Sequence, residues 1–242
     1  MKKINVVVIY SNARKESTYS SVQIFKNAIS NEFNVIFKEF FLPADMPHLC
    51  LFCFSCFQNG ENTCPHSKSV QPIVNAILEA DGLIISSPVY SCDASCSIKS
   101  LFDHMCYLWI SHRPKENMFN KVVMVISTTA GIGIKSSIKT LKKSPRYWGA
   151  KRIYSYGITI RACQWCDVSS KLKTKITRDL TNKSKKFTKA ITHIDSLKSP
   201  LYTRFLFSVM GKMIANYDPN GLLHKDMEYW KEKGWFGKTR PF

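Results

Sequence analysis

Short apolar runs rich in β-branched residues constrain the fold of this chain more than any other feature of its sequence. Three of them, Ile4 to Tyr10, Leu83 to Ile85 and Val122 to Ile126, are almost free of polar residues. A strand has this composition when helices cover both faces of its sheet, as they do in parallel sheets. Two further segments, Asn34 to Phe40 and Ile153 to Ile160, alternate between apolar and polar residues and predict two more strands, the first near the sheet edge.

The segments between these strands carry apolar residues at helical spacing. Val22, Phe25 and Ile29 mark one helix, and similar stripes lie within 73–78, 98–109 and 134–141. Strands that alternate with helices predict an α/β fold, a doubly wound five-stranded parallel sheet with helices on both faces. Ligands of such sheets bind beyond the carboxyl ends of the strands.

The last fifth of the chain is predicted to be a helical, aromatic-rich extension. A long helix after Val168 completes a first domain of residues 1–195, and residues 196–242 form the extension. Two short helices, Tyr202 to Ala215 and His224 to Lys231, are expected in it, separated by a turn with Pro219 and Gly221. Its aromatic side chains need a surface to cover, either the parent domain or a second subunit.

The charge balance limits the ligands of the protein. Lys and Arg number 35 against 17 Asp and Glu, a net charge of +18, which attracts phosphorylated cofactors, nucleic acids or anionic membranes. Between Lys171 and Lys189 there are seven lysines and Arg178 against one acid, Asp179. We interpret this segment as a solvated helix face, so no specific nucleic acid partner is expected. No apolar segment approaches the roughly 20 residues of a membrane span.

Nine cysteines point to a reducing compartment rather than to disulfides. The N-terminal segment shows no small-residue cleavage site and has the pattern of a strand, so we expect a cytoplasmic protein. In that compartment cysteines are free thiols or metal ligands.

Three loops that follow predicted strands are candidates for ligand binding. The first has hydroxyl and amide groups before a helix N-terminus, which suits a phosphate, although Ser17 or Thr18 could instead cap that helix. The second contains Ser-Ser-Pro-Val-Tyr, a sequence suited to a flat ligand in which Pro88 is expected to stiffen a turn, and the third offers glycines and hydroxyls. The candidate residues are Ser11, Asn12, Arg14, Ser17, Thr18, Tyr19 and Ser20; Pro88, Val89, Tyr90, Ser91 and Cys92; and Thr128, Thr129, Ala130, Gly131 and Gly133.

A cysteine-rich segment lies between the second strand and the helix before the third. Cys50, Cys53, Cys56 and Cys64 are spaced C-x2-C-x2-C-x7-C. Thiolates at this spacing can wrap a four-iron, four-sulfur cluster, because one loop can surround three irons while the last ligand closes the site. Zinc and a packed loop of free cysteines are the alternatives. His66 and His104 are expected to be surface or capping groups rather than ligands.

Together these motifs resemble the NADPH-dependent FMN reductase family of flavodoxin-like proteins, including its iron–sulfur flavoprotein branch. Ser11 to Tyr19 occupies the place of the family's first loop, with both of its glycines and its proline replaced. Ala80 to Tyr90 and Ile98 to His104 follow the family's second motif and the helix after it. The resemblance covers about residues 3 to 165, and the aromatic pairs near the end are similar to the extension of longer members.

The resemblance implies a cofactor and an activity. FMN would place its phosphate in the first loop and its isoalloxazine ring against the second and third, and NAD(P)H would be the cosubstrate. The expected function is an NAD(P)H oxidoreductase that passes electrons to a flavin, quinone, nitro compound or other small acceptor, as a homodimer or homotetramer. An iron–sulfur electron carrier supplied by ferredoxin is one alternative. A non-enzymatic membrane-surface or docking protein is the other.

Overall fold

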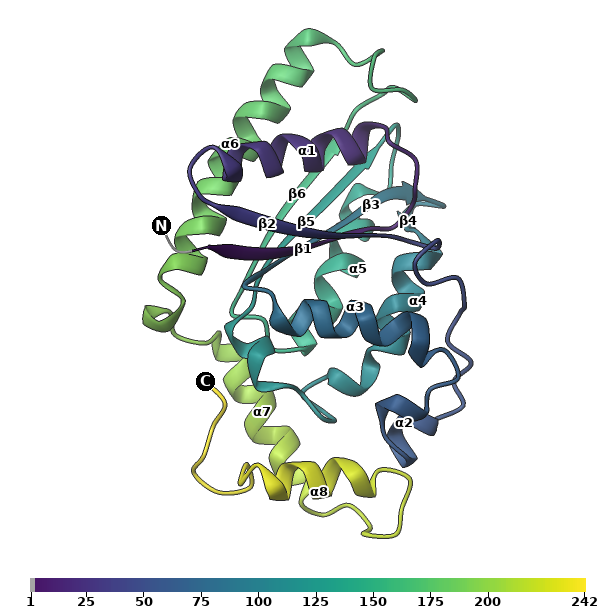
Figure 1. Ribbon diagram of the computed structural model, residues 1–242, viewed down its shortest axis with the longest axis vertical. Helices are drawn as coiled ribbons and strands as arrows, with labels where there is room; N and C mark the ends of the chain where they lie inside the picture. The colour runs from purple at the N-terminus through teal and green to yellow at the C-terminus, as the bar shows by residue number, and fades with distance from the viewer. Residues whose placement is uncertain (1–2) are drawn as a thin grey trace.

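The computed structural model describes residues 3–242 and is built around a parallel sheet with helices on both faces (Figure 1). The strands β1 (Ile4–Tyr10), β2 (Val35–Phe41), β3 (Gly82–Tyr90), β5 (Val122–Thr129) and β6 (Arg152–Thr159) pair in the order β2-β1-β3-β5-β6. A two-residue strand, β4 (Asp93–Ala94), pairs antiparallel with the end of β3. The predicted doubly wound sheet of five parallel strands is therefore confirmed, with β2 at one edge.

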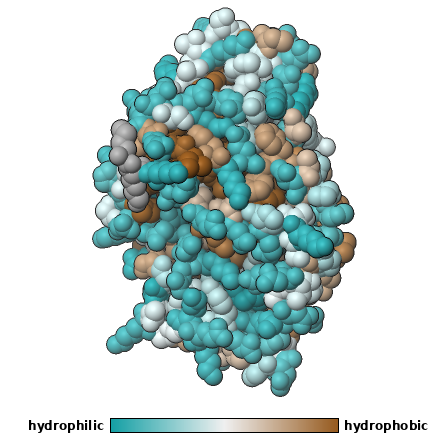
Figure 2. Space-filling model, in the orientation of Figure 1, coloured by the Kyte–Doolittle hydropathy of each residue, from teal (hydrophilic) through white to brown (hydrophobic). Residues whose placement is uncertain are grey.

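The helices divide into two layers. On one face α3 (Ser67–Glu79), α4 (Cys96–His104) and α5 (Ile134–Tyr147) pack against alternate residues of the central strands, among them Val7, Ile85 and Val125. On the other face α1 (Ser17–Ser30) and α6 (Ser170–Thr192) cover the residues between, such as Val8 and Ile84. Both sets of strand residues are buried, which explains the continuous apolar runs. Apolar surface on the face in Figure 2 gathers over the edge strand β2, where Ile36 is exposed.

Two predicted details differ from the structure. Pro88 was expected in a turn but lies inside β3, because residues 87 and 88 stay in register with residues 127 and 128 of β5. The turn comes later, at Ser91 and Cys92, which join β3 to β4. Trp109 was assigned to the helix before it, but α4 ends at His104 and a 3-10 turn, Cys106–Leu108, follows. The other short elements are α2 (Ser55–Gln58) and 3-10 turns at Glu61–Thr63, Glu116–Asn120 and Ile194–Ser196.

The C-terminal segment contains α7 (Leu201–Ile214) and α8 (His224–Glu232), close to the predicted bounds. Phe207, Trp230 and Trp235 from this segment are buried against Ile110 and Phe119 of the preceding residues. The aromatic side chains were expected to cover either the parent domain or a second subunit, and in the structure these three pack against the parent domain. A domain boundary near residue 196 remains a prediction.

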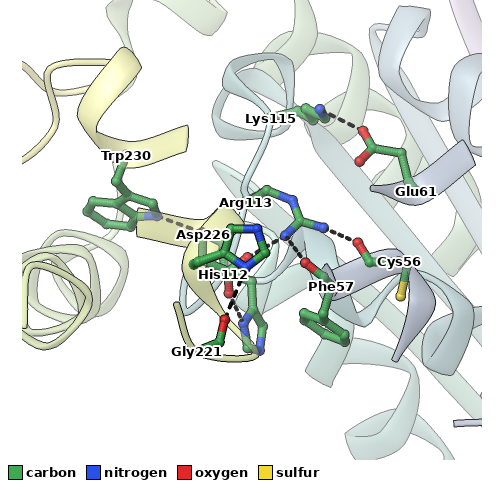
Figure 3. A network of polar contacts seen from close by, with 10 residues as sticks. Cys56, Phe57, Glu61, His112, Arg113, Lys115, Gly221, Asp226 and Trp230 are labelled. Atoms are coloured by element: carbon green, nitrogen blue, oxygen red, sulfur yellow. Dashed lines mark hydrogen bonds and ion pairs between the residues drawn. The ribbon is translucent and has the colours of Figure 1, made fainter. Parts of the chain in front are cut away.

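Buried polar groups hold α8 in place (Figure 3). The Asp226 carboxylate is completely buried and accepts hydrogen bonds from Arg113 (Nη1 to Oδ1, 2.5 Å) and interacts with His112 (Nδ1 to Oδ2, 2.7 Å). The Arg113 guanidinium also donates to the backbone carbonyls of Cys56 and Phe57. A buried ion pair therefore joins α8 to Arg113, and the hydrogen bonds of Arg113 extend this joint to α2 in the cysteine-rich segment.

Candidate functional site

A pocket at the carboxyl ends of β1, β3 and β5 brings together residues of the three predicted loops. Of the candidate residues, those that line it are Asn12, Arg14, Ser17, Thr18, Pro88, Val89, Tyr90, Thr128, Thr129 and Ala130. The parallel direction of the strands produces this convergence, because the carboxyl ends of neighbouring strands meet at one edge of the sheet.

The first loop leaves hydroxyl groups and a helix N-terminus unoccupied by protein partners. Among residues 3–242, six buried side-chain polar atoms lack a hydrogen-bond partner, and two of them, the Oγ atoms of Ser11 and Ser17, belong to the first loop. The N-cap of α1 is Glu16, and no side chain caps this helix. Capping by Ser17 or Thr18, the alternative for this loop, is therefore not what the structure contains. Buried polar groups are nearly always paired, so the loop has the donors that an anion requires.

Two charged side chains of the first loop turn toward the segment after β6. The Glu16 carboxylate accepts a hydrogen bond from the Trp165 amide (2.6 Å), and Arg14 donates to the Cys163 carbonyl (2.9 Å). The negative charge beside the N-terminus of α1 is thereby engaged by a backbone donor, while Arg14 still lines the pocket. These contacts join the first loop to the segment after β6.

The second loop is a tight hairpin. Tyr90 pairs with Asp93, and the two residues between them, Ser91 and Cys92, both have positive φ (47° and 64°). Positive φ at both central residues is the signature of a type I′ turn. Tyr90 is 48% exposed, and its hydroxyl accepts a hydrogen bond from the Asn12 amide (2.7 Å). Its ring is therefore held at the pocket by the first loop.

The third loop is tied to both of the others. The hydroxyls of Thr18 and Thr128 share a buried hydrogen bond of 2.7 Å. Thr129 closes a local turn, accepting from the Gly131 amide (3.1 Å) and donating to the Ile132 carbonyl (3.0 Å). Gly133 has φ of +91°, and a Cβ atom there would lie 2.6 Å from the Cys92 backbone. Glycine is required at residue 133 because the hairpin packs directly against it.

The remaining candidates lie outside the pocket lining. Tyr19 packs on Tyr10, with ring centroids 5.4 Å apart, beside Phe41, and Ser20 is half-buried in α1. Ser11 is buried beneath the first loop, and its carbonyl accepts from Ser97 (2.6 Å) at the start of α4. Ser91, Cys92, Gly131 and Gly133 form the turns that shape the second and third loops.

The segment after β6 contributes residues that the sequence analysis missed. Ile160, Ala162 and Cys163 line the pocket, as does Glu16 of the first loop. The three predicted loops follow other strands, although Ile153 to Ile160 is itself a predicted parallel strand. Its carboxyl end must lie at the same edge of the sheet, which is the signal that could have identified this segment.

The cysteine-rich segment forms a second cluster of potential ligands. Its cysteines are free thiols, and Cys53 is the exposed one of the four. Burial raises the pKa of the Cys56 thiol to about 11, and the nearby thiols of Cys64, Cys50 and Cys53 add to the rise. The thiols of Cys64, Cys50 and Cys53 are thus near enough to Cys56 to influence its pKa. Phe52 and Phe54 have positive φ (52° and 57°), so the backbone is in the left-handed region on both sides of Cys53.

Two histidines and a fifth cysteine lie beside these thiols, which the sequence analysis did not predict. Burial raises the pKa of Cys106 to about 12, with Cys56 and Cys50 as further causes. His104 was expected to be a surface or capping group. It is 5% exposed, so the surface role is wrong, but its bond to the Ser100 carbonyl in the last turn of α4 fits the capping role. Its Nε2 atom lies 3.1 Å from Nδ1 of His66. Burial lowers the pKa of His104 from its usual value.

The fold defines a flavodoxin-like α/β protein, with a candidate ligand pocket at the carboxyl ends of its strands. The sequence profile of the family described as NADPH-dependent FMN reductase matches residues 4–159. The chain therefore belongs to the NADPH-dependent FMN reductase family, and the resemblance noted in the sequence is confirmed.

Two archaeal proteins and one solved structure show the range of this similarity. An iron–sulfur flavoprotein of Methanocaldococcus jannaschii is 32% identical over 130 residues, which span 53% of this chain and 65% of that protein. An iron–sulfur flavoprotein of Archaeoglobus fulgidus is 26% identical over 191 residues, 76% of this chain and 78% of the relative. The NAD(P)H:quinone oxidoreductase of Methanothermobacter marburgensis shares the fold, with a TM-score of 0.59, 13% identity, and coverage of 76% of this chain and 98% of that one.

No helix within residues 3–242 is both long enough and apolar enough to cross a membrane.

Proposed function

We propose that the pocket binds FMN and that the protein is an NAD(P)H-dependent oxidoreductase that reduces a small acceptor. The observation that carries this proposal is the buried, unpartnered hydroxyl of Ser17, which lines the pocket beside the uncapped N-terminus of α1, with a second unpartnered hydroxyl, that of Ser11, beneath the same loop. A phosphate monoester supplies the acceptors that these donors lack. Arg14 adds positive charge at the same pocket.

The other two loops suit the ring of the cofactor. Pro88, Val89 and the exposed ring of Tyr90 offer an apolar surface for one side of the isoalloxazine, and the backbone at Thr129 and Ala130 can bond its polar edge. Bound FMN would supply the hydride and electron chemistry, while the protein binds it, orients it and sets its potential through hydrogen bonds.

Anaerobic purification followed by a visible spectrum tests the cofactor. Flavin absorption, or binding of added FMN to colourless protein, is expected. NADPH and NADH oxidation would then be measured with a free flavin, a quinone, a nitro compound and a ferric salt as acceptors. Holoprotein that oxidises neither nucleotide with any acceptor would overturn the reductase assignment. Protein that does not bind FMN but sediments with anionic vesicles would favour the membrane-surface alternative.

An iron–sulfur electron carrier is the second candidate, supported by the names of the two archaeal relatives and by the spacing of Cys50, Cys53, Cys56 and Cys64. Iron and sulfide analysis of the same anaerobic sample tests it. About four irons and four sulfides per chain would support a cubane cluster, with ferredoxin as the electron donor to assay.

A homodimer or homotetramer in the cytoplasm is also part of the proposal. Leu51, Phe52 and Phe54 in the cysteine-rich segment are 64%, 64% and 46% exposed. Neighbouring apolar side chains at such exposure favour burial against another copy of the chain. Light scattering on a sizing column would give the mass. A monomer at all concentrations would contradict the oligomer.

A further inference from the structure

A thiol and two imidazoles converge beside the cysteine-rich segment. Cys64 follows the 3-10 turn Glu61–Thr63, His66 precedes α3, and His104 is the last residue of α4. One ligand atom from each side chain lies within 4.8 Å of those of the other two. This is the one group of three such ligands at that distance among residues 3–242, and Cys50, Cys53 and Cys56 are outside it.

A hydrogen bond at Nδ1 of His104 orients the ring and so determines where its Nε2 atom points. Nδ1 of His104 lies 2.9 Å from the Ser100 carbonyl, one turn earlier in α4. Because a carbonyl oxygen only accepts, Nδ1 carries the proton, and Nε2 presents its lone pair toward His66. Metal-binding histidines are generally oriented in this way, with the outer ring nitrogen bonded to a carbonyl or carboxylate.

The position of His66 is also restricted. Its ring stacks on that of His48, with centroids 4.7 Å apart and planes inclined by 19°. Nδ1 of His66 and Nε2 of His104 are 3.1 Å apart. Two Zn–N bonds of about 2.0–2.1 Å at a tetrahedral angle place their nitrogens roughly 3.3 Å apart. The two imidazoles are thus nearly at ligand spacing, and a metal ion would replace the proton that now lies between them.

We propose that Cys64, His66 and His104 bind one divalent metal ion of the zinc class. One thiolate and two imidazoles form a mixed sulfur and nitrogen set, which Zn²⁺ prefers. A cubane cluster would instead use the thiolates of Cys50, Cys53, Cys56 and Cys64 and would not need either histidine. The two assignments compete for Cys64, so they can be separated by experiment. A water molecule or a neighbouring side chain would complete the coordination.

The site would fasten the cysteine-rich segment to α4. Several residues of that segment, including Leu49, Leu51 and Cys53, are exposed, and its cysteines form no disulfide. A metal ion that binds only the folded protein stabilises it in proportion to its binding free energy. The metal ion would join Cys64 and His66 to His104 and would therefore help to order the exposed part of this segment.

Cobalt titration of the full chain tests this assignment. Reduced protein is stripped with a chelator, and Co²⁺ is added while difference spectra are recorded against metal-free protein of the same flavin content. We expect one Co²⁺ per chain, with the ligand-field absorption of a tetrahedral site and a thiolate-to-cobalt band, both removed by Zn²⁺. The His66→Gln and His104→Gln variants should lose more affinity than the roughly 10–100-fold typical of outer-shell changes. Cys64→Ser should abolish the thiolate band.

Cys53→Ser is the matched control, because Cys53 belongs to the cysteine motif but not to the proposed site. It should bind Co²⁺ as the wild type does. If the buried His104 variant fails to fold, the half-buried His66 gives the same comparison. Absence of stoichiometric binding, or equal loss in Cys53→Ser and His66→Gln, overturns the proposal. So does a protein isolated with about four irons and four sulfides that Cys53→Ser removes and His66→Gln retains.

Discussion

Buried polar groups lack hydrogen-bond partners at the pocket but have them at the interface with α8. In the first loop of the pocket, the hydroxyls of Ser17 and, beneath it, Ser11 are buried without partners among the described residues. At the α8 interface, the Asp226 carboxylate is just as deeply buried, but both its oxygens interact with positively charged or ring nitrogen groups (Figure 3). Since an unpaired buried group costs free energy, the first arrangement suits a site awaiting a ligand and the second suits a structural joint.

The largest effect is expected from breaking the structural joint. Asp226→Asn removes the charge that compensates Arg113, whose side chain is 5% exposed. An uncompensated buried charge typically costs about 3–5 kcal/mol, so the free energy of unfolding should fall by that amount in urea denaturation. Glu116→Gln is the control, because its ion pair with Lys233 is largely exposed (3.0 Å) and should contribute less than about 1 kcal/mol. Equal losses in the two variants would contradict this difference.

A smaller loss of stability should come from the turn that supports the pocket. Gly133→Ala puts a methyl group 2.6 Å from the backbone of Cys92 at a residue with φ of +91°. We expect a loss of about 2–3 kcal/mol in the free energy of unfolding, together with weaker FMN binding. Gly131→Ala is the matched control, because nothing lies within 4 Å of a Cβ atom there. If Gly131→Ala is as destabilising as Gly133→Ala, the packing of the second loop against the third is not the reason.

The third prediction concerns ligand binding rather than stability. Ser17→Ala removes a buried hydroxyl that has no partner, so the FMN-free protein should be as stable as the wild type or slightly more so. FMN affinity should fall roughly 10-fold or more, because a hydrogen bond to a charged group is worth about 1.5–3 kcal/mol. Fluorescence titration of FMN measures this change.

Ser21→Ala separates the role of this hydroxyl from a general effect on the helix. Ser21 is buried in the same helix, but its hydroxyl donates to the Ser17 carbonyl (2.8 Å). It should lose some stability and keep its FMN affinity. The opposite result, in which Ser21→Ala weakens FMN binding and Ser17→Ala does not, would remove the assignment of the phosphate to the first loop.

The pocket could be predicted from the sequence to a much greater extent than the metal cluster. Apolar runs such as Ile4–Tyr10 report strand position directly, and the rule that ligands bind at the carboxyl ends of parallel strands then brings residues 12, 88 and 128 together. No comparable rule predicts that His66 and His104 lie close together. They lie at the ends of different helices, and only the packing of α3 and α4 on one sheet face places their rings in contact.

The buried ion pair of Asp226 was unpredictable for a related reason. Its partners are 113 and 114 residues earlier in the chain, and no periodic pattern links them. The sequence indicated that the aromatic residues of the extension must be covered, but not that Ile110 and Phe119 would cover them. Local patterns therefore predict the elements, while contacts between distant segments depend on how those elements pack.

The smallest effect should come from Lys121, a buried cation at neither the pocket nor the joint. Its ammonium donates to the carbonyls of Leu78 and Ala80, and burial lowers the pKa of Lys121 to about 8. The pKa of Lys121 is lower in the folded protein than in the unfolded chain, so the unfolded chain binds more protons at pH values between the two. The contribution of Lys121 to stability therefore rises with pH above about 8 and is lost as the pH falls through it. The wild type should gain about 1 kcal/mol relative to Lys121→Met between pH 8 and pH 9. Urea denaturation at both pH values measures the difference, and effects of other groups, including the buried thiols, cancel between the two proteins. If the difference in unfolding free energy between the two proteins does not change with pH, burial does not lower the pKa of Lys121 in the folded protein.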